Sequence, residues 1–199
     1  MISQNSTHYV LLLLVLSLTL LACIDENAKK SGTPPDNSGS VAAKKMPISR
    51  VGPLYENYHQ TPATQAQKDE NTLIDYAMEK ELDVKRTASG LYYIIEKEGK
   101  GPFYFKGEPC KVHYTGYTLD GKIFDSSHKR NEPLAFKVGQ MIPGWNEALK
   151  LMNTGTKAKL LIPSHLAYGT KGFPGLIGPN EPLVFDLEIM PFLDTKPGN

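Results

Sequence analysis

The chain has 199 residues and a formal net charge of +1, and 40% of its residues are hydrophobic. This length allows one or two domains, and the apolar content can support one modest core. The near-neutral charge excludes the marked basic excess of proteins that bind nucleic-acid phosphates, so we expect no nucleic-acid partner. The 5 histidines and 2 cysteines lie scattered without metal-ligand spacing, and we therefore expect neither a metal site nor a cofactor.

Residues 1–22 are predicted to be a targeting signal. A run of 12 mostly apolar residues, Val10 to Leu21, is too short for a membrane-spanning helix, which needs about 20 residues. The run ends in Leu20-Leu21-Ala22-Cys23, which resembles the lipobox of bacterial lipoproteins. That resemblance implies lipidation at Cys23 and a cell-envelope protein that is lipid-anchored to the membrane, on the periplasmic or outer-membrane side. An ordinary signal peptide or anchor with an incidental cysteine is the alternative.

Residues 23–50 are predicted to be a flexible tether. From about Asp25 to Met46 the chain is rich in Ser, Gly, Pro, Asn and Lys. Such a composition buries too little apolar surface to offset the entropy lost on ordering. A tether of this kind would hold a folded domain away from a membrane surface.

A helical extension is expected over residues 51–89. Thr61 is a candidate N-cap, and Pro62 suits the first helical position. An apolar stripe follows at helical spacing, formed by Leu73, Ile74, Ala77, Met78 and Leu82. The stripe could pack on the chain's own domain or pair with a second copy of the chain. Because it is only about three turns long, we favour packing within the chain or a loose appendage.

The run from Val112 to Ser127, V-H-Y-T-G-Y-T-L-D-G-K-I-F-D-S-S, carries the clearest functional signal. It begins as a half-buried strand and turns at Asp120-Gly121, because Asp-Gly tolerates the positive φ of hairpin turns. Phe124 and Asp125 end the returning strand. An aromatic ring beside a carboxylate suits a small apolar pocket with one polar contact. Taken alone, the run also fits a plain hairpin with a core phenylalanine and a turn-capping aspartate.

Two other residues of the first predicted strand, Cys110 and His113, have simpler interpretations. Cys110 lies on the strand's inward face together with Tyr114, and we expect a buried, inert thiol there. His113 points to the opposite face and is interpreted as a surface residue.

Further motifs follow in the C-terminal half. Met141-Ile142-Pro143-Gly144-Trp145 opens a short helix that runs to about Met152. Ala167-Tyr168-Gly169 and Gly172-Phe173-Pro174-Gly175-Leu176-Ile177 come next, and the strand Leu183 to Ile189 closes the series. With the preceding run, these motifs resemble the FK506-binding-protein (FKBP) family of peptidyl-prolyl cis-trans isomerases, motif after motif in the family's order.

The resemblance covers about residues 90–193 and defines an isomerase domain at 90–199. It implies an α+β fold in which an antiparallel sheet of five or six strands wraps around one short helix. The alternation of apolar residues agrees, since it predicts strands near Leu91–Glu96, Lys111–Tyr117, Phe124–Asp125, Leu134–Val138, Ala158–Ile162 and Leu183–Ile189.

The family's roles can be assigned to matching positions of this sequence. By resemblance, Trp145 forms the floor of a pocket for the proline ring, and Asp125 organises hydrogen bonds at the rim. Tyr168 donates its hydroxyl group to a substrate carbonyl, so Asp125 and Tyr168 are the expected catalytic residues. The remaining expected substrate-binding residues are Tyr114, Phe124, Phe136, Ile142, Phe173, Ile177 and Phe185. Each aromatic residue among them also fits a plain core position.

Two functions are consistent with this pattern. The resemblance implies an isomerase that binds proline-containing polypeptides, and FK506-like macrolides, and that assists the folding of exported proteins. The alternative is a non-catalytic FKBP-like binding or scaffold lipoprotein of an envelope assembly, such as gliding machinery. Retention of Trp145, Asp125 and Tyr168 favours the isomerase. Leu134, Phe173 and Gly178 depart from the family's usual residues, and these departures bear on peptide preference and macrolide affinity.

Overall fold

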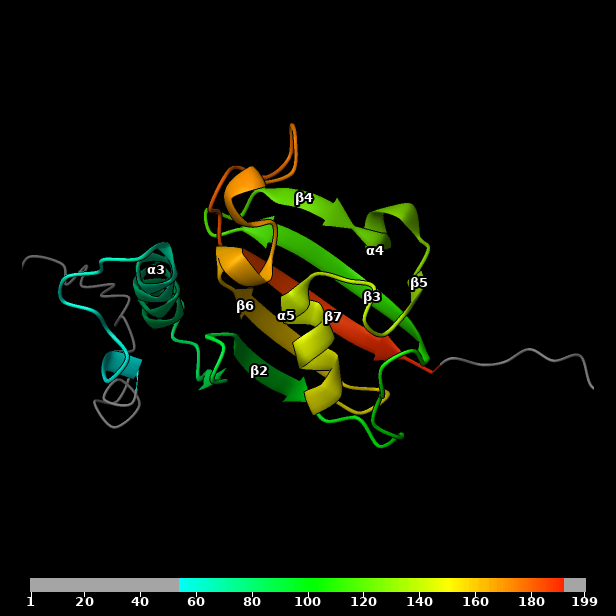
Figure 1. Ribbon diagram of the computed structural model, residues 1–199. Coiled ribbons are helices and arrows are strands. Elements are labelled where there is room, and N and C mark those ends of the chain that lie inside the picture. The colour runs from blue at the N-terminus through cyan, green and yellow to red at the C-terminus, as the bar shows by residue number, and fades with distance from the viewer. Residues whose placement is uncertain (1–53, 192–199) are drawn as a thin grey trace, which may run out of the picture. The chain divides into compact units, whose positions relative to one another are not determined.

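The computed structural model describes residues 54–191, which lie within one compact unit of the chain, residues 44–199. The predicted signal segment, the tether and Cys23 lie outside the described residues. The described part is built on a seven-stranded antiparallel sheet with the order β1-β2-β6-β7-β3-β4, and β5 pairs with β3 (Figure 1). The strands are β1 (Lys85–Arg86), β2 (Tyr92–Lys97), β3 (Pro109–Thr118), β4 (Ile123–Ser126), β5 (Leu134–Lys137), β6 (Lys157–Ile162) and β7 (Leu183–Met190).

The predicted fold class, an antiparallel sheet around one short helix, is confirmed. The expected number of strands was five or six, and the seventh is β1, which pairs Lys85 with Tyr93 and Arg86 with Tyr92. Two residues are too few to show the alternation by which a strand is recognised. The Asp120-Gly121 turn is also present, since Gly121 has a φ of +87° and its N–H bonds to the carbonyl oxygen of Thr118 at 2.9 Å.

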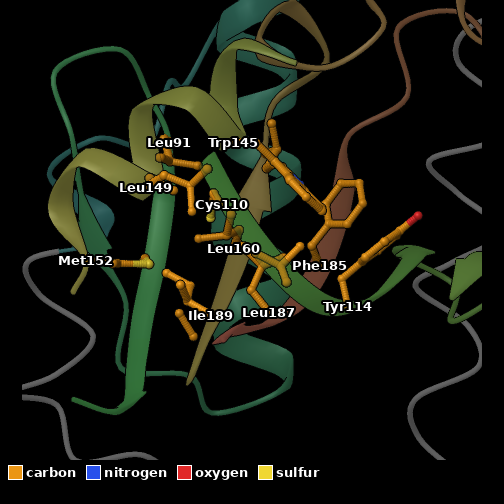
Figure 2. Close-up of a cluster of buried hydrophobic side chains, with 14 of the residues drawn as sticks. Leu91, Cys110, Tyr114, Trp145, Leu149, Met152, Leu160, Phe185, Leu187 and Ile189 are labelled. Carbon is orange, nitrogen blue, oxygen red and sulfur yellow. The ribbon is translucent and has the colours of Figure 1, made fainter. Parts of the chain in front are cut away.

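The short helix α5 (Pro143–Ala148) lies across one face of the sheet and continues as the 3-10 turn η1 (Leu149–Leu151) (Figure 1). Trp145 and Leu149 point from it into the main core, where they meet alternate residues of the central strands (Figure 2). Gly144 permits this close approach, because a Cβ atom there would lie 2.7 Å from Cγ2 of Ile162.

Helix α3 (Gln65–Glu79) packs on the other face of the sheet. Leu73 and Ile74, both fully buried, contact a second core that contains Leu161 of β6 and Val184 of β7. On those two strands the neighbouring positions 160, 162, 183 and 185 belong to the main core instead. Successive side chains of a strand point to opposite faces, so the two cores lie on opposite sides of one sheet. The apolar stripe of the extension is therefore used within the chain.

The predicted start of this helix is wrong by three residues. The N-cap is Thr64, not Thr61, and Gln65 is the first helical residue. Thr64 and Gln67 form a capping box, in which each side chain bonds to the other residue's backbone N–H. This reciprocal pair satisfies two helical donors, whereas Thr61 has no matching acceptor three residues later.

Short helical turns complete the described part. Helix α4 (Ser127–Arg130) follows β4, and the 3-10 turns η2 (Ser164–Leu166) and η3 (Gly169–Lys171) follow β6. Within residues 54–191 no helix combines the length and the apolar character that crossing a membrane requires.

Candidate functional site

Five aromatic rings from five elements meet where α5 crosses the sheet. Trp145 lies edge-to-face with Tyr114 of β3 and with Phe185 of β7, at centroid distances of 5.1 and 5.2 Å. Phe124 of β4 meets Phe185 at 5.5 Å, also edge-to-face. Phe136 of β5 lies 6.0 Å from Trp145. Figure 2 shows Tyr114, Trp145 and Phe185 directed toward one another from α5 and the sheet. Such edge-to-face contacts add stability beyond the apolar area that they bury.

Burial divides these rings into two groups. Trp145, Phe185 and Tyr114 are only 1%, 3% and 5% exposed, so they are core residues as well as the base of the site. Phe124 and Phe136 are partly exposed at the edge of the main core. The first group fixes the position of the floor, and the second presents apolar surface that a ligand could cover.

Gly116 is required by this aromatic packing. A Cβ atom at this position would lie 2.6 Å from Cζ of Phe124 and 2.7 Å from Cε1 of Phe185. Glycine is therefore needed here because the two rings approach the backbone closely, and not because of an unusual backbone angle. Both rings occupy the space in front of β3 that a side chain at position 116 would fill.

Asp125 lies beside the cluster and joins two donors. One carboxylate oxygen accepts a hydrogen bond from the hydroxyl group of Tyr114, and the other accepts one from Nη1 of Arg130. The Nη2 atom of Arg130 also donates to the Tyr114 oxygen, at 3.0 Å. Burial by itself would raise the pKa of Asp125, but the hydrogen bonds from Tyr114 and Arg130 outweigh it and lower the pKa. The carboxylate is thus held in its ionised form at the edge of the site.

Ser127 fixes the backbone of Tyr114. Its hydroxyl group is buried, accepts from the Tyr114 N–H at 2.7 Å and donates to the Tyr114 carbonyl at 3.1 Å. The same oxygen lies 2.9 Å from Nδ1 of His113, whose ring stacks on His128 at 4.5 Å. The interpretation of His113 as a plain surface residue is therefore wrong, because α4 covers one side of its ring.

Asn146 shapes the loop before α5. Its side-chain oxygen accepts from the backbone N–H groups of Gly139 and Met141, at 2.9 and 3.3 Å, and its amide donates to the Met141 carbonyl. This loop leads into Ile142, the N-cap of α5. None of the hydrogen bonds among the described residues uses the backbone N–H of Ile142. The loop therefore offers a fixed and unused donor next to Trp145.

Tyr168 stands on the other side of the site, at the start of η3. Its ring packs against the main core and lies edge-to-face with Phe173 at 5.7 Å. Burial, and to a lesser degree the negative charge of Asp125, raise the pKa of its hydroxyl group. That hydroxyl group makes no hydrogen bond with any residue in the described range. It is therefore a neutral donor that has no partner among residues 54–191.

The segment after Tyr168 folds back on itself. Phe173 and Ile177 exchange two backbone hydrogen bonds of 2.9 Å each, which close a tight loop. Ile177 is buried in the main core, whereas Phe173 is 47% exposed. Of the expected site residues, Phe173 is therefore the most exposed, and it is linked to the main core through Tyr168 and Ile177.

The structure thus brings all ten expected pocket residues into one region. Eight belong to the main core or pack against it, and Asp125 is bonded to Tyr114. Phe173 lies at the margin of this region, against Tyr168. Three residues of the site were not predicted from the sequence: Arg130, Ser127 and Asn146. Their signals were weak, because Ser-Ser-His-Lys-Arg resembles a solvated turn and Asn146 looks like an ordinary helix-surface residue.

The described residues contain no cluster of three side chains that could hold a metal ion. Cys110 is fully buried in the main core, and burial raises the pKa of its thiol to about 11. A thiol that stays protonated is a poor nucleophile. The groups that the described residues present at this site are apolar side chains and hydrogen-bond donors.

Known proteins are similar to this chain in sequence. The family model described as FKBP-type peptidyl-prolyl cis-trans isomerase matches residues 104–190. FkpA from Escherichia coli strain K12, an FKBP-type peptidyl-prolyl cis-trans isomerase, is 48% identical over 118 residues, which cover 59% of this chain and 42% of that protein. A probable FKBP-type isomerase from Haemophilus influenzae is 42% identical over 130 residues, 65% of this chain and 53% of that protein. The chain therefore spans about half, or less, of the length of these curated relatives.

Solved structures agree with the sequence matches. The crystal structure of FkpA from Escherichia coli superimposes with a TM-score of 0.58 at 39% identity, covering 70% of this chain and 62% of that one. A peptidyl-prolyl cis-trans isomerase from Pseudomonas syringae gives a TM-score of 0.56 at 39% identity, covering 67% and 97%. The sheet, the short crossing helix and the aromatic site define a prolyl-isomerase fold. The chain belongs to the FKBP-type peptidyl-prolyl cis-trans isomerase family, as its motifs predicted.

Proposed function

We propose that this protein is a peptidyl-prolyl cis-trans isomerase acting on proline-containing polypeptides. The observation that carries the proposal is the position of two unused donors around an aromatic floor. The Tyr168 hydroxyl group and the Ile142 backbone N–H have no partner in the described range, and both residues pack against the main core that contains Trp145. Family membership supports the same activity.

The reaction needs no covalent step. An Xaa–Pro bond isomerises slowly because resonance gives its C–N bond partial double-bond character. Twisting the amide removes that resonance and its charge separation, so an apolar pocket favours the twisted form over the planar one. An acceleration of tenfold requires only about 1.4 kcal/mol of such preference. A few apolar contacts that fit the twisted amide better than the planar one are therefore sufficient.

The two donors would hold the peptide during the twist. In the proposed complex the proline ring rests among Phe124, Phe136 and Trp145. The Ile142 N–H binds a carbonyl oxygen on one side, and the Tyr168 hydroxyl group binds one on the other. Donors fixed in place before the reaction cost no reorganisation as the amide rotates. We assign to Asp125 the role of fixing Tyr114 at the rim, because its two oxygens are already occupied by Tyr114 and Arg130.

Ligand preference follows from the margin of the site. The exposed ring of Phe173 and the half-buried Leu134 are apolar, so a bulky apolar residue before proline would be favoured. FK506-like macrolides, which are apolar and rich in carbonyl acceptors, would compete for the same surface. Binding of such a macrolide should inhibit isomerisation, and titration calorimetry would measure its affinity.

The cellular setting is a second part of the proposal. The sequence Leu20-Leu21-Ala22-Cys23 supports lipidation at Cys23 and anchoring to a membrane of the cell envelope, where exported proteins would be the clients. Cys23→Ser should abolish incorporation of radioactive palmitate and leave an uncleaved precursor. Stable attachment needs more than one acyl chain. Labelling of the substituted protein would contradict the lipid anchor and leave the isomerase proposal intact.

Activity is tested with a short peptide that carries an apolar residue before proline. The cis-to-trans rate should rise in proportion to protein concentration, and a macrolide should suppress the increase. Absence of any increase, with the protein folded, would instead favour the non-catalytic binding or scaffold role. In that event the macrolide and proline-rich peptides should still bind.

A further inference from the structure

The buried side chain of Asp69 joins helix α3 to the segment that carries Tyr168. Its Oδ2 atom accepts hydrogen bonds from the backbone N–H and the hydroxyl group of Ser164, at 2.8 and 2.5 Å. Its Oδ1 atom accepts one from Nε2 of Gln65 at 2.6 Å. Asp69 and Ser164 are each 2% exposed, so water does not compete for these bonds.

Ser164 lies one turn before the proposed catalytic hydroxyl group. It begins η2, in which the N–H of Leu166 bonds to the Pro163 carbonyl and that of Ala167 bonds to the Ser164 carbonyl, both at 2.9 Å. Tyr168 follows immediately. A group that fixes Ser164 therefore fixes the start of a closed turn whose other end carries Tyr168.

The frame behind Asp69 is rigid at both ends. Leu73 and Ile74 hold α3 on Leu161 of β6, and β6 runs directly into Pro163 and Ser164. The fully buried contacts leave α3 no freedom to slide on the sheet, because packed interiors contain few voids. The Asp69 carboxylate is thus held at a fixed position next to η2.

A second link ties the same turn to the floor of the site. Nε2 of His165 lies 3.1 Å from the carbonyl oxygen of Ser89, and the Ser89 hydroxyl group donates to Glu147 of α5 at 2.7 Å. Glu147 and Trp145 belong to the same helix. This link is exposed, so water can replace it, whereas the Asp69 contact is buried and has no such substitute.

We propose that Asp69 is a positioning residue of the isomerase site, which sets the place of the Tyr168 hydroxyl group through Ser164. This inference rests on the proposed isomerase function. Asp69 lies outside residues 104–190, the segment matched by the family model. The N-terminal helix is then a working part of the catalytic unit as well as a connection to the tether.

A double-mutant cycle between Asp69 and Tyr168 in the full-length protein tests the proposal. Asp69→Ala leaves both Ser164 donors unpaired and should lower kcat/KM. This loss should be no larger than the loss of about tenfold that Tyr168→Phe causes. The loss should fall mainly on kcat, since the donor is needed as the amide twists. In the Tyr168→Phe background the same change should cost less than about twofold.

Three further variants separate positioning from folding. Asp69→Asn keeps an oxygen for both Ser164 donors and should restore most of the activity. Asp75→Ala changes an exposed carboxylate on the same helix and should leave activity unchanged. Ser164→Ala keeps the backbone hydrogen bond to Asp69 and loses only the hydroxyl one. It should therefore lower kcat/KM less than Asp69→Ala does, and it should have no effect on kcat/KM in the Tyr168→Phe background. If Asp69→Ala does not fold, Ser164→Ala replaces it in the cycle.

Hydrogen exchange at Leu166 and Ala167 provides a readout that does not need activity. Asp69→Ala should accelerate exchange there, and Asp69→Asn should not. Equal activity losses in both Tyr168 backgrounds would overturn the positioning role. If the parent protein shows no isomerisation, the proposed function fails by itself. The exchange measurement at Leu166 and Ala167 then decides by itself whether Asp69 holds this turn in place. Unchanged exchange in Asp69→Ala would overturn the proposal.

Discussion

The hydroxyl group of Tyr114 donates a hydrogen bond to the carboxylate of Asp125 across the β3–β4 hairpin. Arg130, one turn after β4, bonds to both partners and closes a three-membered network. The network places an ionised carboxylate at the edge of an aromatic cluster without pointing a free oxygen into it. Its first consequence is for the stability of the hairpin that carries Phe124.

Asp125→Asn should destabilise the protein in a pH-dependent way. The folded-state pKa of Asp125 is lowered below its usual value of 3.8, so its stabilising effect is complete above that value. The effect is lost as pH falls through the still lower folded-state pKa. Because the Asp125 side chain is 37% exposed, solvent screening limits the loss to about 1 kcal/mol or less.

Urea unfolding of both proteins between pH 2 and pH 7 measures this difference. The gap in unfolding free energy should be largest above about pH 5 and should close below pH 3.8. A gap that stays constant over the whole range would show that the ionised carboxylate does not stabilise the hairpin.

Tyr168→Phe should lower activity without a change in stability. The hydroxyl group has no partner among residues 54–191, so its removal should alter the unfolding free energy by no more than about 0.5 kcal/mol. One lost donor to the twisted amide corresponds to about 1.4 kcal/mol, or about tenfold in kcat/KM. Tyr93→Phe, a half-buried tyrosine of β2, is the matched control and should keep full activity. Full activity in Tyr168→Phe would show that apolar contacts alone carry the reaction.

Gly116→Ala should damage both fold and site. The added methyl group overlaps the rings of Phe124 and Phe185, and overpacking of a filled core costs about 1–3 kcal/mol. Since the two rings must move apart, kcat/KM should fall as well. Thermal unfolding and the peptide assay measure the two effects. An unchanged melting temperature would mean that the rings shift freely and do not form a fixed wall.

Ile74→Ala tests whether α3 is part of the folded domain. The side chain is fully buried against the outer face of the sheet, so its truncation should cost about 2–5 kcal/mol in a single cooperative transition. Asp75→Ala, its exposed neighbour, should change stability by no more than about 0.5 kcal/mol. A separate early transition in Ile74→Ala, with the main transition unchanged, would show that the helix is only an appendage.

The apolar periodicity predicts most of this fold because each central strand alternates between two cores. Leu160 and Leu161 are both fully buried, one on each face of β6, and such doubly buried strands read as continuous apolar runs. The start of α3 was misplaced because Thr61-Pro62 is a good local signal, while the capping box of Thr64 depends on a side chain three residues later.

The aromatic part of the site follows from motif order, whereas its polar part does not. Arg130 and Ser127 act only because α4 turns back toward β3, so that Ser127 meets Tyr114 13 positions away and Arg130 meets it 16 positions away. Asp69 and Ser164 are separated by 95 positions. No local pattern indicates such pairs, because each partner looks like a solvated polar residue until the sheet brings them together.

The rate of cis-to-trans isomerisation of an apolar-Xaa–Pro peptide, measured with wild-type protein and with Tyr168→Phe side by side, tests the central claim most directly. The account predicts a rate above the uncatalysed one that grows in proportion to wild-type concentration and falls about tenfold in the variant. A wild-type rate equal to that of the peptide alone, in protein shown to be folded, would contradict it.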